Sequence, residues 1–387
     1  MTMAFVRLGD VTDMASGFAF KSSMFLDASD DGVLLVRGDN VQQGYIRWGE
    51  KAKKWSKDDC DDLARYQLQK DDVILAMDRP IVGGGLKLAW IKDQDLPSLL
   101  VQRVSRIRGI SGKSKTNFLR YALSDTDFVA HIDRITTGAN IPHISGKDIA
   151  SYQLRLPSLD EQDRIVEFLS TYDGLIENNH HRIALLEESA QHLYSEWFVK
   201  LRFPGHELAA QVAGLPNGWR LGRLDQALLL QRGFDLPTQS RRYGDIPVYS
   251  STGITAYHDE ARAQGPGVVT GRSGTLGVVH FVHEDYWPLN TALWVKEFRA
   301  VTPMVAYFML SGMSLDQYNS GASVPTLDRK VAHAQPVVIP PSSVMAQFEG
   351  IVESVFAQIQ TLRRAVAALQ EARNALLPKV LSGELAV

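Results

Sequence analysis

The sequence predicts an α+β fold: two mixed, strand-rich globular domains, each followed by a long helix, with the two helices pairing as a coiled coil. Three observations predict this fold. A set of motifs recurs at a constant displacement, and two segments carry the sustained heptad patterns of long paired helices. The remaining segments consist of short β-branched runs separated by Gly, Asn, Asp and Pro, as is typical of strands and turns. A length of 387 residues also exceeds one ordinary hydrophobic core.

The repeat has a displacement of 183 positions. The motif Thr137-Gly-Ala-Asn-Ile-Pro142 is matched by Ser320-Gly-Ala-Ser-Val-Pro325, and Leu156-Pro157 is matched by Ile339-Pro340. Because the displacement continues without a gap into the following segments, chance does not explain it. We therefore expect the order globule, helix, globule, helix, with segments 1–150, 151–203, 204–335 and 336–387.

The first globule is expected to be rich in strands. Residues 33–36 and 72–75 are β-branched runs flanked by turn residues, and residues 115–123 form a short helix by their pattern.

The first long helix is predicted over residues 160–197, where apolar residues recur at alternating spacings of four and three. Ser158 and Glu161 have the spacing of a capping box at its start. Asn179 is a polar residue within the apolar stripe, a choice that commonly fixes register in coiled coils. The predicted seam positions on this helix are Ile165, Leu169, Tyr172, Ile176, Asn179, Ile183 and Leu186.

The second globule is expected to repeat the character of the first, after a glycine-containing linker at residues 205–219. Residues 267–270 and 277–280 are predicted strands, and residues 303–311 are a predicted helix.

The second long helix repeats the stripe 183 positions further on. The two helices have about 40 and 35 residues, or about 60 and 50 Å. Stripes of that length exceed the face of one domain and favour helix-to-helix pairing, the alternative being that each helix packs on its own domain. The predicted seam positions here are Val352, Val355, Ile359, Leu362, Val366 and Leu369.

Side chains that hydrogen-bond phosphates and base edges gather in glycine-containing turns of the first globule and in a basic stretch that follows them. An ion pair between Arg37 and Asp39 is the alternative interpretation of the first of these turns. The candidate DNA-binding residues in this globule are Arg37, Asn40, Gln42, Arg79, Lys87, Arg103, Lys113 and Lys115.

In the second globule, Gly271-Arg-Ser-Gly-Thr-Leu-Gly277 lies between two predicted strands, where such a turn brings polar side chains against a phosphate or a groove. A plain hairpin connection is the alternative. The candidate DNA-binding residues here are Ser250, Thr252, Arg272, Ser273 and Thr275.

Catalytic motifs are missing. Pro340-Pro341 is followed by Ser342 and not by the aromatic residue that amino-methyltransferases place there. Cys60 lies among aspartates, which raise the pKa of a thiol and weaken it as a nucleophile. Asp328 and Lys330 fit the end of a nuclease acid-acid-lysine pattern, but the first copy of the repeat lacks the carboxylate. We therefore expect a recognition protein with no catalytic residue, metal or cofactor of its own.

The chain contains no run of about 18 apolar residues, and its start lacks the apolar stretch of a signal peptide. We expect a soluble, cytoplasmic protein without membrane contact. A net charge of -3 does not favour a nucleic-acid partner, but local basic patches still supply phosphate contacts when acidic residues lie elsewhere, as they do on the first helix.

Several of these segments together resemble the specificity subunit of type I restriction–modification systems. The resemblance rests on Val36-Arg-Gly-Asp-Asn40, on Leu156-Pro-Ser-Leu-Asp-Glu-Gln162, on the glycine-rich turn at 271–277 and on Leu381-Ser-Gly-Glu-Leu385, in that order and within a duplicated register. It covers essentially the whole chain.

The resemblance implies that each globule is a target-recognition domain that reads one half of an asymmetric, bipartite site on double-stranded DNA. It implies that the two helices pair antiparallel, set the gap between the half-sites and dock two modification (methyltransferase) subunits. S-adenosylmethionine then belongs to the methyltransferase subunit, and ATP and Mg to a restriction subunit where one is present.

Helices that overlap by about 50 Å, against about 34 Å per turn of DNA, predict a gap of about 5–8 base pairs. Apolar residues off the seam are the candidate contacts with partner subunits: Phe168, Leu175, Leu185 and Phe198. A coiled-coil protein-interaction scaffold without DNA binding is the alternative function, which the net acidity favours slightly.

Overall fold

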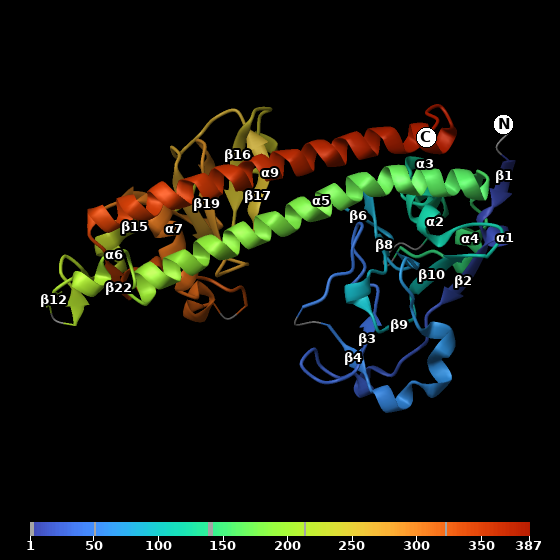
Figure 1. The fold of residues 1–387 in the computed structure, drawn as a ribbon, viewed down its shortest axis with the longest axis horizontal. Coiled ribbons are helices and arrows are strands. Elements are labelled where there is room, and N and C mark those ends of the chain that lie inside the picture. Colours follow the sequence, from blue (N-terminus) through green and yellow to red (C-terminus); the bar gives the residue numbers. More distant parts are fainter. Residues whose placement is uncertain (1–3, 50–51, 138–141, 213, 322) are drawn as a thin grey trace. The chain divides into compact units, whose positions relative to one another are not determined.

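The computed structural model describes residues 4–49, 52–137, 142–212, 214–321 and 323–387. The chain forms two compact units (Figure 1): unit 1 comprises Met1–Asn179 and Ala365–Val387, and unit 2 comprises His180–Arg364. Each unit therefore contains one strand-rich segment together with a part of both long helices. The predicted α+β class is confirmed.

Unit 1 contains a main sheet, a smaller sheet and two strand pairs. Its strands are β1 (Ala4–Arg7), β2 (Thr12–Ser16), β3 (Val33–Val36), β4 (Lys54–Trp55), β5 (Val73–Ala76), β6 (Ile81–Val82), β7 (Gly85–Leu86), β8 (Leu88–Trp90), β9 (Ser98–Leu100), β10 (Val104–Gly109) and β11 (Gln153–Leu156), and its short helices are α1 (Leu8–Val11), α2 (Thr116–Ala122), α3 (Thr126–Ile135) and α4 (Gly146–Ala150). The main sheet is antiparallel, in the order β2-β10-β5-β8. In the smaller sheet β3 lies between β4 and β9 and runs parallel to β9, while β1 pairs with β11 and β6 with β7.

Unit 2 repeats this arrangement. Its strands are β12 (Gln211–Val212), β13 (Leu215–Pro216), β14 (Arg220–Arg223), β15 (Leu228–Arg232), β16 (Ile246–Ser250), β17 (Gly253–His258), β18 (Gly267–Gly271), β19 (Val279–Val282), β20 (Trp287–Pro288), β21 (Ala292–Phe298) and β22 (Pro336–Ile339), and its short helices are α6 (Leu224–Ala227), α7 (Pro303–Gly312) and α8 (Arg329–His333). The main antiparallel sheet has the order β15-β21-β18-β19. The smaller sheet, β17-β16-β20, again has one parallel pair, β16 with β20.

The strand registers show that the two units are copies of one design. In unit 1 Ala4 pairs with Leu156, and in unit 2 Arg220 pairs with Ile339. Leu156 and Ile339 are separated by the displacement of the sequence repeat. The repeat found in the sequence therefore reflects a duplicated three-dimensional unit.

The long helices are α5 (Leu159–Tyr194) and α9 (Ser342–Ser382). The predicted capping box at the start of α5 is confirmed: the Ser158 amide donates to Glu161 Oε2 at 3.0 Å, and the Glu161 amide donates to Ser158 Oγ at 3.4 Å. Hydrogen bonding from Ser158 lowers the pKa of the Glu161 carboxyl. This pair satisfies donors that the first turn of any helix leaves without a partner.

Within each unit the two long helices pack against each other in opposite directions. In unit 1, Leu169 near the start of α5 shares an apolar core with Leu377 near the end of α9. In unit 2, Ile183 in the later part of α5 packs with Ile359 and Leu362 in the earlier part of α9. The predicted seam positions Ile165, Leu169, Ile176, Ile183, Val352, Ile359, Leu362 and Val366 are buried, and Tyr172, Asn179, Leu186, Val355 and Leu369 are half-buried.

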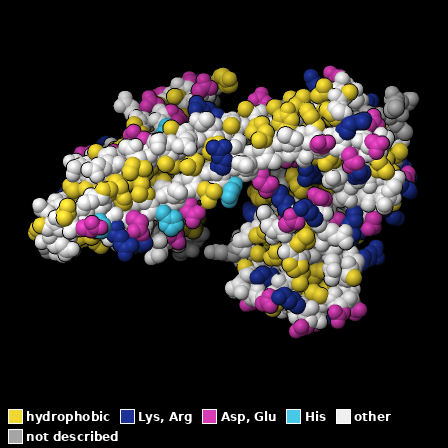
Figure 2. All heavy atoms as spheres, viewed as in Figure 1, with side chains coloured by type: hydrophobic (Ala, Val, Ile, Leu, Met, Phe, Trp, Pro, Cys, Tyr) yellow, Lys and Arg dark blue, Asp and Glu magenta, His cyan; other side chains and the backbone are white. Residues whose placement is uncertain are grey.

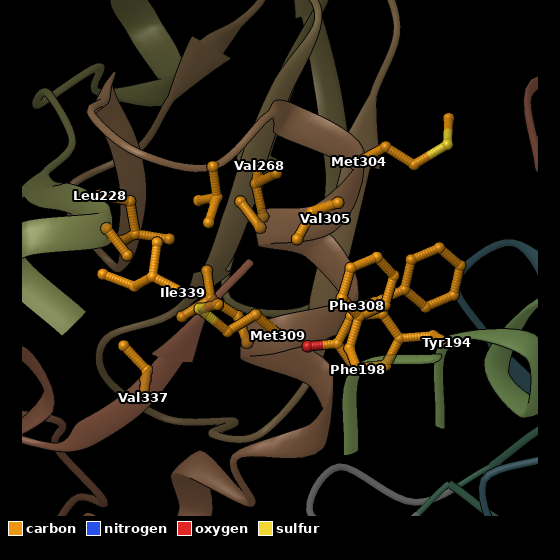
Figure 3. Packing of buried hydrophobic residues seen from close by; sticks show 14 of the residues in the cluster. Tyr194, Phe198, Leu228, Val268, Met304, Val305, Phe308, Met309, Val337 and Ile339 are labelled. Atoms are coloured by element: carbon orange, nitrogen blue, oxygen red, sulfur yellow. The ribbon is translucent and has the colours of Figure 1, made fainter. Parts of the chain in front are cut away.

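The core of unit 2 joins its sheet to both long helices. Figure 3 shows the rings of Tyr194, Phe198 and Phe308 together, beside aliphatic side chains such as Val305 and Ile339. Tyr194 and Phe308 stack with their ring centroids 5.3 Å apart. Helix α5 is therefore fastened to α7 by burial of aromatic area, and to the sheet through the core that they share.

Phe198 was expected to be a partner contact off the seam, and that expectation is wrong. It is only 7% exposed, and its ring packs edge-on against Phe348 at 4.9 Å. The physical reason is that α5 changes to a π-helical turn over Ser195–Val199. Such a turn is wider than an α-helical one and shifts the direction of the side chains that follow.

Candidate nucleic-acid interface

In unit 1, three backbone segments meet at one end of strand β5. We call them turn cluster 1: residues 77–80, Arg103 and residues 142–144. The Met77 amide donates to the Arg103 carbonyl at 2.8 Å, and the Arg79 amide donates to the Pro142 carbonyl at 2.6 Å. The Ile144 amide donates to the Met77 carbonyl at 2.9 Å. These hydrogen bonds fix the turn that follows strand β5.

Unit 2 has the same arrangement at one end of β18, which we call turn cluster 2: residues 272–275, residues 290–291 and residues 325–327. The Arg272 amide donates to the Thr291 carbonyl at 2.9 Å, and the Gly274 amide donates to the Pro325 carbonyl at 2.9 Å. The Leu327 amide donates to the Arg272 carbonyl at 2.8 Å. Each bond has its counterpart in unit 1.

The two clusters contain the ends of the repeated motif found in the sequence. Pro142 and Pro325 are its last residues and accept the equivalent hydrogen bonds. Residues 138–141 and 322 of the motif lie outside the described residues. The motif thus supplies a backbone acceptor that holds the turn, while the side chains of the turn itself differ between the copies.

Cations gather beside turn cluster 1. The Lys87 ammonium donates to the carbonyl of Gly38. Burial lowers the pKa of Lys87; nearby Asp39 raises it, whereas Arg47 and Arg79 lower it. Basic and acidic side chains alternate on the drawn face of the strand-rich part of unit 1 (Figure 2). Positive charge is therefore confined to small patches, which is consistent with the net charge of -3 for the whole chain.

Arg79 and Arg103 are exposed, and Arg37 is half-buried. Gln42 donates from Nε2 to the Asp39 carbonyl at 3.0 Å. These side chains, with Lys87, are the predicted DNA-binding residues that lie in or beside the turns of unit 1.

Other predicted residues of unit 1 serve the fold. Asn40 is 4% exposed; its Oδ1 accepts the Arg37 amide at 3.1 Å and its Nδ2 donates to the Arg47 carbonyl at 3.0 Å. Both ends of its amide are used inside the turn, so the prediction that Asn40 reads a base is wrong. Lys113 donates to the Asp10 carbonyl at 3.0 Å.

Lys115 directly precedes helix α2 and contacts the start of helix α5. Its amide donates to Gln162 Oε1 at 2.8 Å, and its ammonium forms an ion pair with Asp163. Both contacts join the loop before α2 to the first turns of α5. A role for Lys115 in placing the helix accounts for these contacts, and the prediction of a DNA contact loses its basis.

In unit 2, the predicted residues divide in the same way. Ser250 is buried; its Oγ accepts the Thr252 amide at 3.2 Å and donates to the Gly253 carbonyl at 3.2 Å, so it serves the turn and its prediction as a DNA contact is wrong. Thr252 and Thr275 are exposed. The Thr252 hydroxyl shares a hydrogen bond with Ser250 Oγ at 2.9 Å, so Thr275 is the more accessible of the two beside turn cluster 2.

Arg272 and Ser273 are half-buried. Arg272 donates from Nη1 to the Asn290 carbonyl at 3.1 Å, which aligns its guanidinium along the neighbouring turn. The sequence reasoning missed Asn290 and Thr291, and also Arg47 in unit 1. Thr291 can be found by comparing the two units. It lies directly before β21, as Arg103 lies directly before β10, and its carbonyl accepts the equivalent hydrogen bond.

Among the described residues, no group of three His, Cys, Asp or Glu side chains could hold a metal ion. Burial and the neighbouring Asp59 raise the pKa of the Cys60 thiol, as the sequence predicts in direction. Asp328 caps helix α8 by accepting the Lys330 amide at 2.8 Å, so the carboxylate of the nuclease-like pattern is used as a cap.

The remaining candidate partner contacts lie on α5. Leu175 and Leu185 are 49% and 48% exposed, and Phe168 is half-buried with its ring 5.7 Å from that of Tyr172. Throughout the described part of the chain, no helix is long and apolar enough to cross a membrane.

Comparison with known proteins finds relatives in one family. Residues 2–188 match the family described as the type I restriction modification DNA specificity domain. The chain is 35% identical over 172 residues to the type I restriction enzyme MjaVIII specificity subunit of Methanocaldococcus jannaschii, and 34% identical over 171 residues to the EcoAI specificity subunit of Escherichia coli. Each match covers 44% of this chain, but only 40% and 28% of the respective relative, so less than half of either relative's length is matched.

The crystal structure of a type I restriction–modification S subunit from M. genitalium is similar in fold, with a TM-score of 0.57 at 16% identity. That likeness covers 98% of this chain and 96% of the other. The family match covers the first copy of the repeat, and the hydrogen bonds of the two turn clusters relate the second copy to the first.

Proposed function

Since the chain belongs to the family of type I restriction–modification specificity subunits, we propose that it reads a bipartite DNA site, with each unit's turn cluster facing one half. The observation that carries this proposal is the pair of equivalent turn clusters. They share the backbone hydrogen bonds and differ in side chains, with Arg79 and Arg103 in one and Gly274 and Thr291 in the other. A common backbone arrangement that carries different residues suits two units that recognise different base sequences.

The long helices are the proposed spacer between the half-sites. Their opposed packing within each unit, with Leu169 against Leu377 and Ile183 against Ile359, supports a ruler whose length depends on both helices. The exposed Leu175 and Leu185 support docking of two modification subunits on these helices. Burial of such apolar surface is what drives stable association.

The chain itself is proposed to perform no catalysis. In this assignment S-adenosylmethionine belongs to the methyltransferase subunits, and ATP and Mg to a restriction subunit where one accompanies them. The chain is proposed to need no cofactor of its own and to act in the cytoplasm, where its DNA substrate lies.

The test is selection from a random pool of DNA duplexes by the chain co-purified with its modification subunits. We expect enrichment of two short, different sequences separated by a fixed gap of about 5–8 base pairs. Binding should weaken steeply with salt, since phosphate contacts release counterions. Enrichment of no sequence, together with a flat salt dependence, would support the protein scaffold instead and overturn the proposal.

The spacer role has a separate test. Four residues inserted into α5 after Glu177, about one helical turn, should change the gap and leave both half-sites unchanged. The measurement is sequencing of methylated DNA from cells that express the complex. The same insertion after Glu384, past the end of α9, is the control and should leave the gap unchanged. Altered half-sites with a constant gap would contradict the spacer role.

A further inference from the structure

Two exposed arginines in turn cluster 1 have a left-handed backbone. The φ angle is +46° at Arg79 and +68° at Arg103. Residues with a Cβ adopt this conformation at an energetic cost, and glycine does so freely. Backbone strain of this kind persists where the surrounding structure imposes it and often marks a functional position.

The surrounding structure does impose it. The Arg79 amide is held by the Pro142 carbonyl at 2.6 Å, and the Arg103 carbonyl accepts the Met77 amide at 2.8 Å. The first bond joins the turn after β5 to the segment before α4, and the second joins it to the turn before β10. The two guanidinium groups are thus carried by adjacent turns whose backbones are fixed before any ligand binds.

Unit 2 shows that this backbone does not require arginine. Gly274 occupies the place of Arg79, with a φ of +89°, and accommodates the left-handed conformation without a side chain. Thr291 occupies the place of Arg103. The arginines in unit 1 therefore carry a conformational cost that their role in the fold does not explain.

We propose that Arg79 and Arg103 are a specificity-determining pair that recognises guanine in the half-site bound by unit 1. The proposal rests on the DNA-reading function proposed above and adds the residues and the base. An arginine guanidinium donates two hydrogen bonds to O6 and N7 of guanine in the major groove, the commonest specific contact in protein–DNA complexes.

The carboxylate of Asp78 beside the pair favours a base over a phosphate. Asp78 directly precedes Arg79 in the sequence, and its Oδ2 lies 3.9 Å from Arg103 Nε. A carboxylate beside the guanidinium repels an approaching phosphate, whereas the guanine edge is uncharged. In the described part of the chain, no hydrogen bond joins the side chain of Arg79 to another residue. Its donors remain available to a ligand.

The experiment replaces each arginine by glycine and by lysine in the full chain with its modification subunits. Arg79→Gly and Arg103→Gly remove the side chain and relieve the left-handed backbone, so thermal stability should stay the same or rise. Binding to the wild-type duplex should fall roughly 5- to 150-fold, and selection should lose its preference for guanine in one half-site only. Arg79→Lys and Arg103→Lys keep the charge without the planar fork and should also lose that preference.

Asp71→Gly is the matched control. Asp71 is also left-handed, with a φ of +68°, but lies before β5, at the strand's other end. We expect its substitution to leave the selected sequence unchanged.

The possible results separate the two proposals. If the wild-type complex selects no sequence, the proposed function fails. If it selects a bipartite site that the glycine variants bind equally well, the arginine pair is wrong. Weakening that is uniform for all sequences, with a shallower salt dependence and recovery in the lysine variants, would indicate phosphate contacts and overturn guanine recognition.

Discussion

The two units fasten their sheets to the long helices in different ways, although the fold is duplicated. In unit 1 a half-buried polar contact, which we call the polar joint, supplements the apolar core that contains Leu169 and Leu377. Asp173 on α5 accepts hydrogen bonds from the Tyr121 hydroxyl at 2.6 Å and from Arg373 Nη1 on α9 at 2.7 Å. Arg120 lies 3.5 Å from the same carboxylate. One acid thus joins helix α2 to both long helices.

In unit 2 the equivalent positions are apolar. Phe356 stands at the repeat position of Asp173, and Ala190 stands at that of Arg373. The Phe356 ring lies 5.4 Å from that of Phe281 and 5.9 Å from that of Tyr307. Equivalent positions of the repeat are therefore charged and hydrogen-bonded in one copy and aromatic or aliphatic in the other. The polar joint depends on each partner being present, whereas the aromatic joint depends on buried area.

The largest effect should come from the centre of the aromatic joint. Phe348 is fully buried and touches the rings of Phe198 and Phe308. Phe348→Ala should cost about 3–5 kcal/mol of unfolding free energy, because it removes a ring and leaves a cavity. Denaturant-induced unfolding of the wild-type chain and the variant measures this loss of free energy. The control Ile351→Ala, exposed on the same helix, should change stability by less than about 0.5 kcal/mol. Similar losses in both variants would contradict an aromatic joint.

The next effect tests the polar joint. Asp173→Asn should cost about 3 kcal/mol in unit 1, because it leaves Arg373 and Arg120 without the charge that compensates them. The Asp173 side chain is only 18% exposed, so solvent screens this loss little. Asp163 on the same helix is paired with Lys115, and its side chain is more exposed than that of Asp173. Asp163→Asn should therefore cost less than about 1 kcal/mol. Hydrogen exchange of α2 amides measures the difference, and equal costs would show that Asp173 has no special role.

The third prediction is that acid destabilises unit 2 more than unit 1. Burial lowers the pKa of His280, His283 and His333 in unit 2 below the ordinary value of 6.5. The unfolded chain binds these protons at a higher pH than the folded unit does. Unit 2 therefore loses stability as pH falls below about 6.5.

His333 localises this loss. Its Nε2 accepts the Leu230 amide at 2.9 Å, and a protonated ring cannot accept that bond. Protection of the Leu230 amide should fall by about 1 kcal/mol between about pH 7.5 and about pH 5.5, after correction for intrinsic exchange. Ala150 stands at the repeat position of His333, so strand β2 of unit 1 is the internal control. Equal acid responses in β2 and β15, or an unchanged response in His333→Gln, would contradict this cause.

The repeat and the helix stripes were predictable because they depend on periodic apolar positions, which burial preserves. The same reasoning placed the turn after β18 correctly between two strands. It failed for Phe198, which lies in the π-helical turn over Ser195–Val199, and it failed for Asn40 and Ser250. Short polar side chains in turns hydrogen-bond their own backbone as readily as a ligand, and composition cannot distinguish the two uses.

Left-handed backbone at Arg79 and Arg103 is also invisible to composition, since arginine has no preference for that conformation. The equivalent backbone hydrogen bonds of the two units identify Gly274 as the counterpart of Arg79, and this comparison shows that the conformation is unusual for arginine. Tertiary pairing therefore supplied the information on the candidate site that the sequence lacked.

The smallest predicted effect decides what kind of polar joint unit 1 has. Lys92 and Glu177 on α5 form an ion pair at 2.8 Å, with side chains 34% and 63% exposed. If general attraction between opposite charges fastened the sheet to the helix, Lys92→Met would weaken unit 1 as much as Asp173→Asn. We expect a loss of about 0.5 kcal/mol or less, which added salt reduces further, because water screens this pair. A double-mutant cycle with Glu177→Gln measures the coupling. A small value beside a large one for Asp173 and Arg373 would assign the joint to buried, directional hydrogen bonds, because the two pairs have the same charges on the same helix and differ in burial.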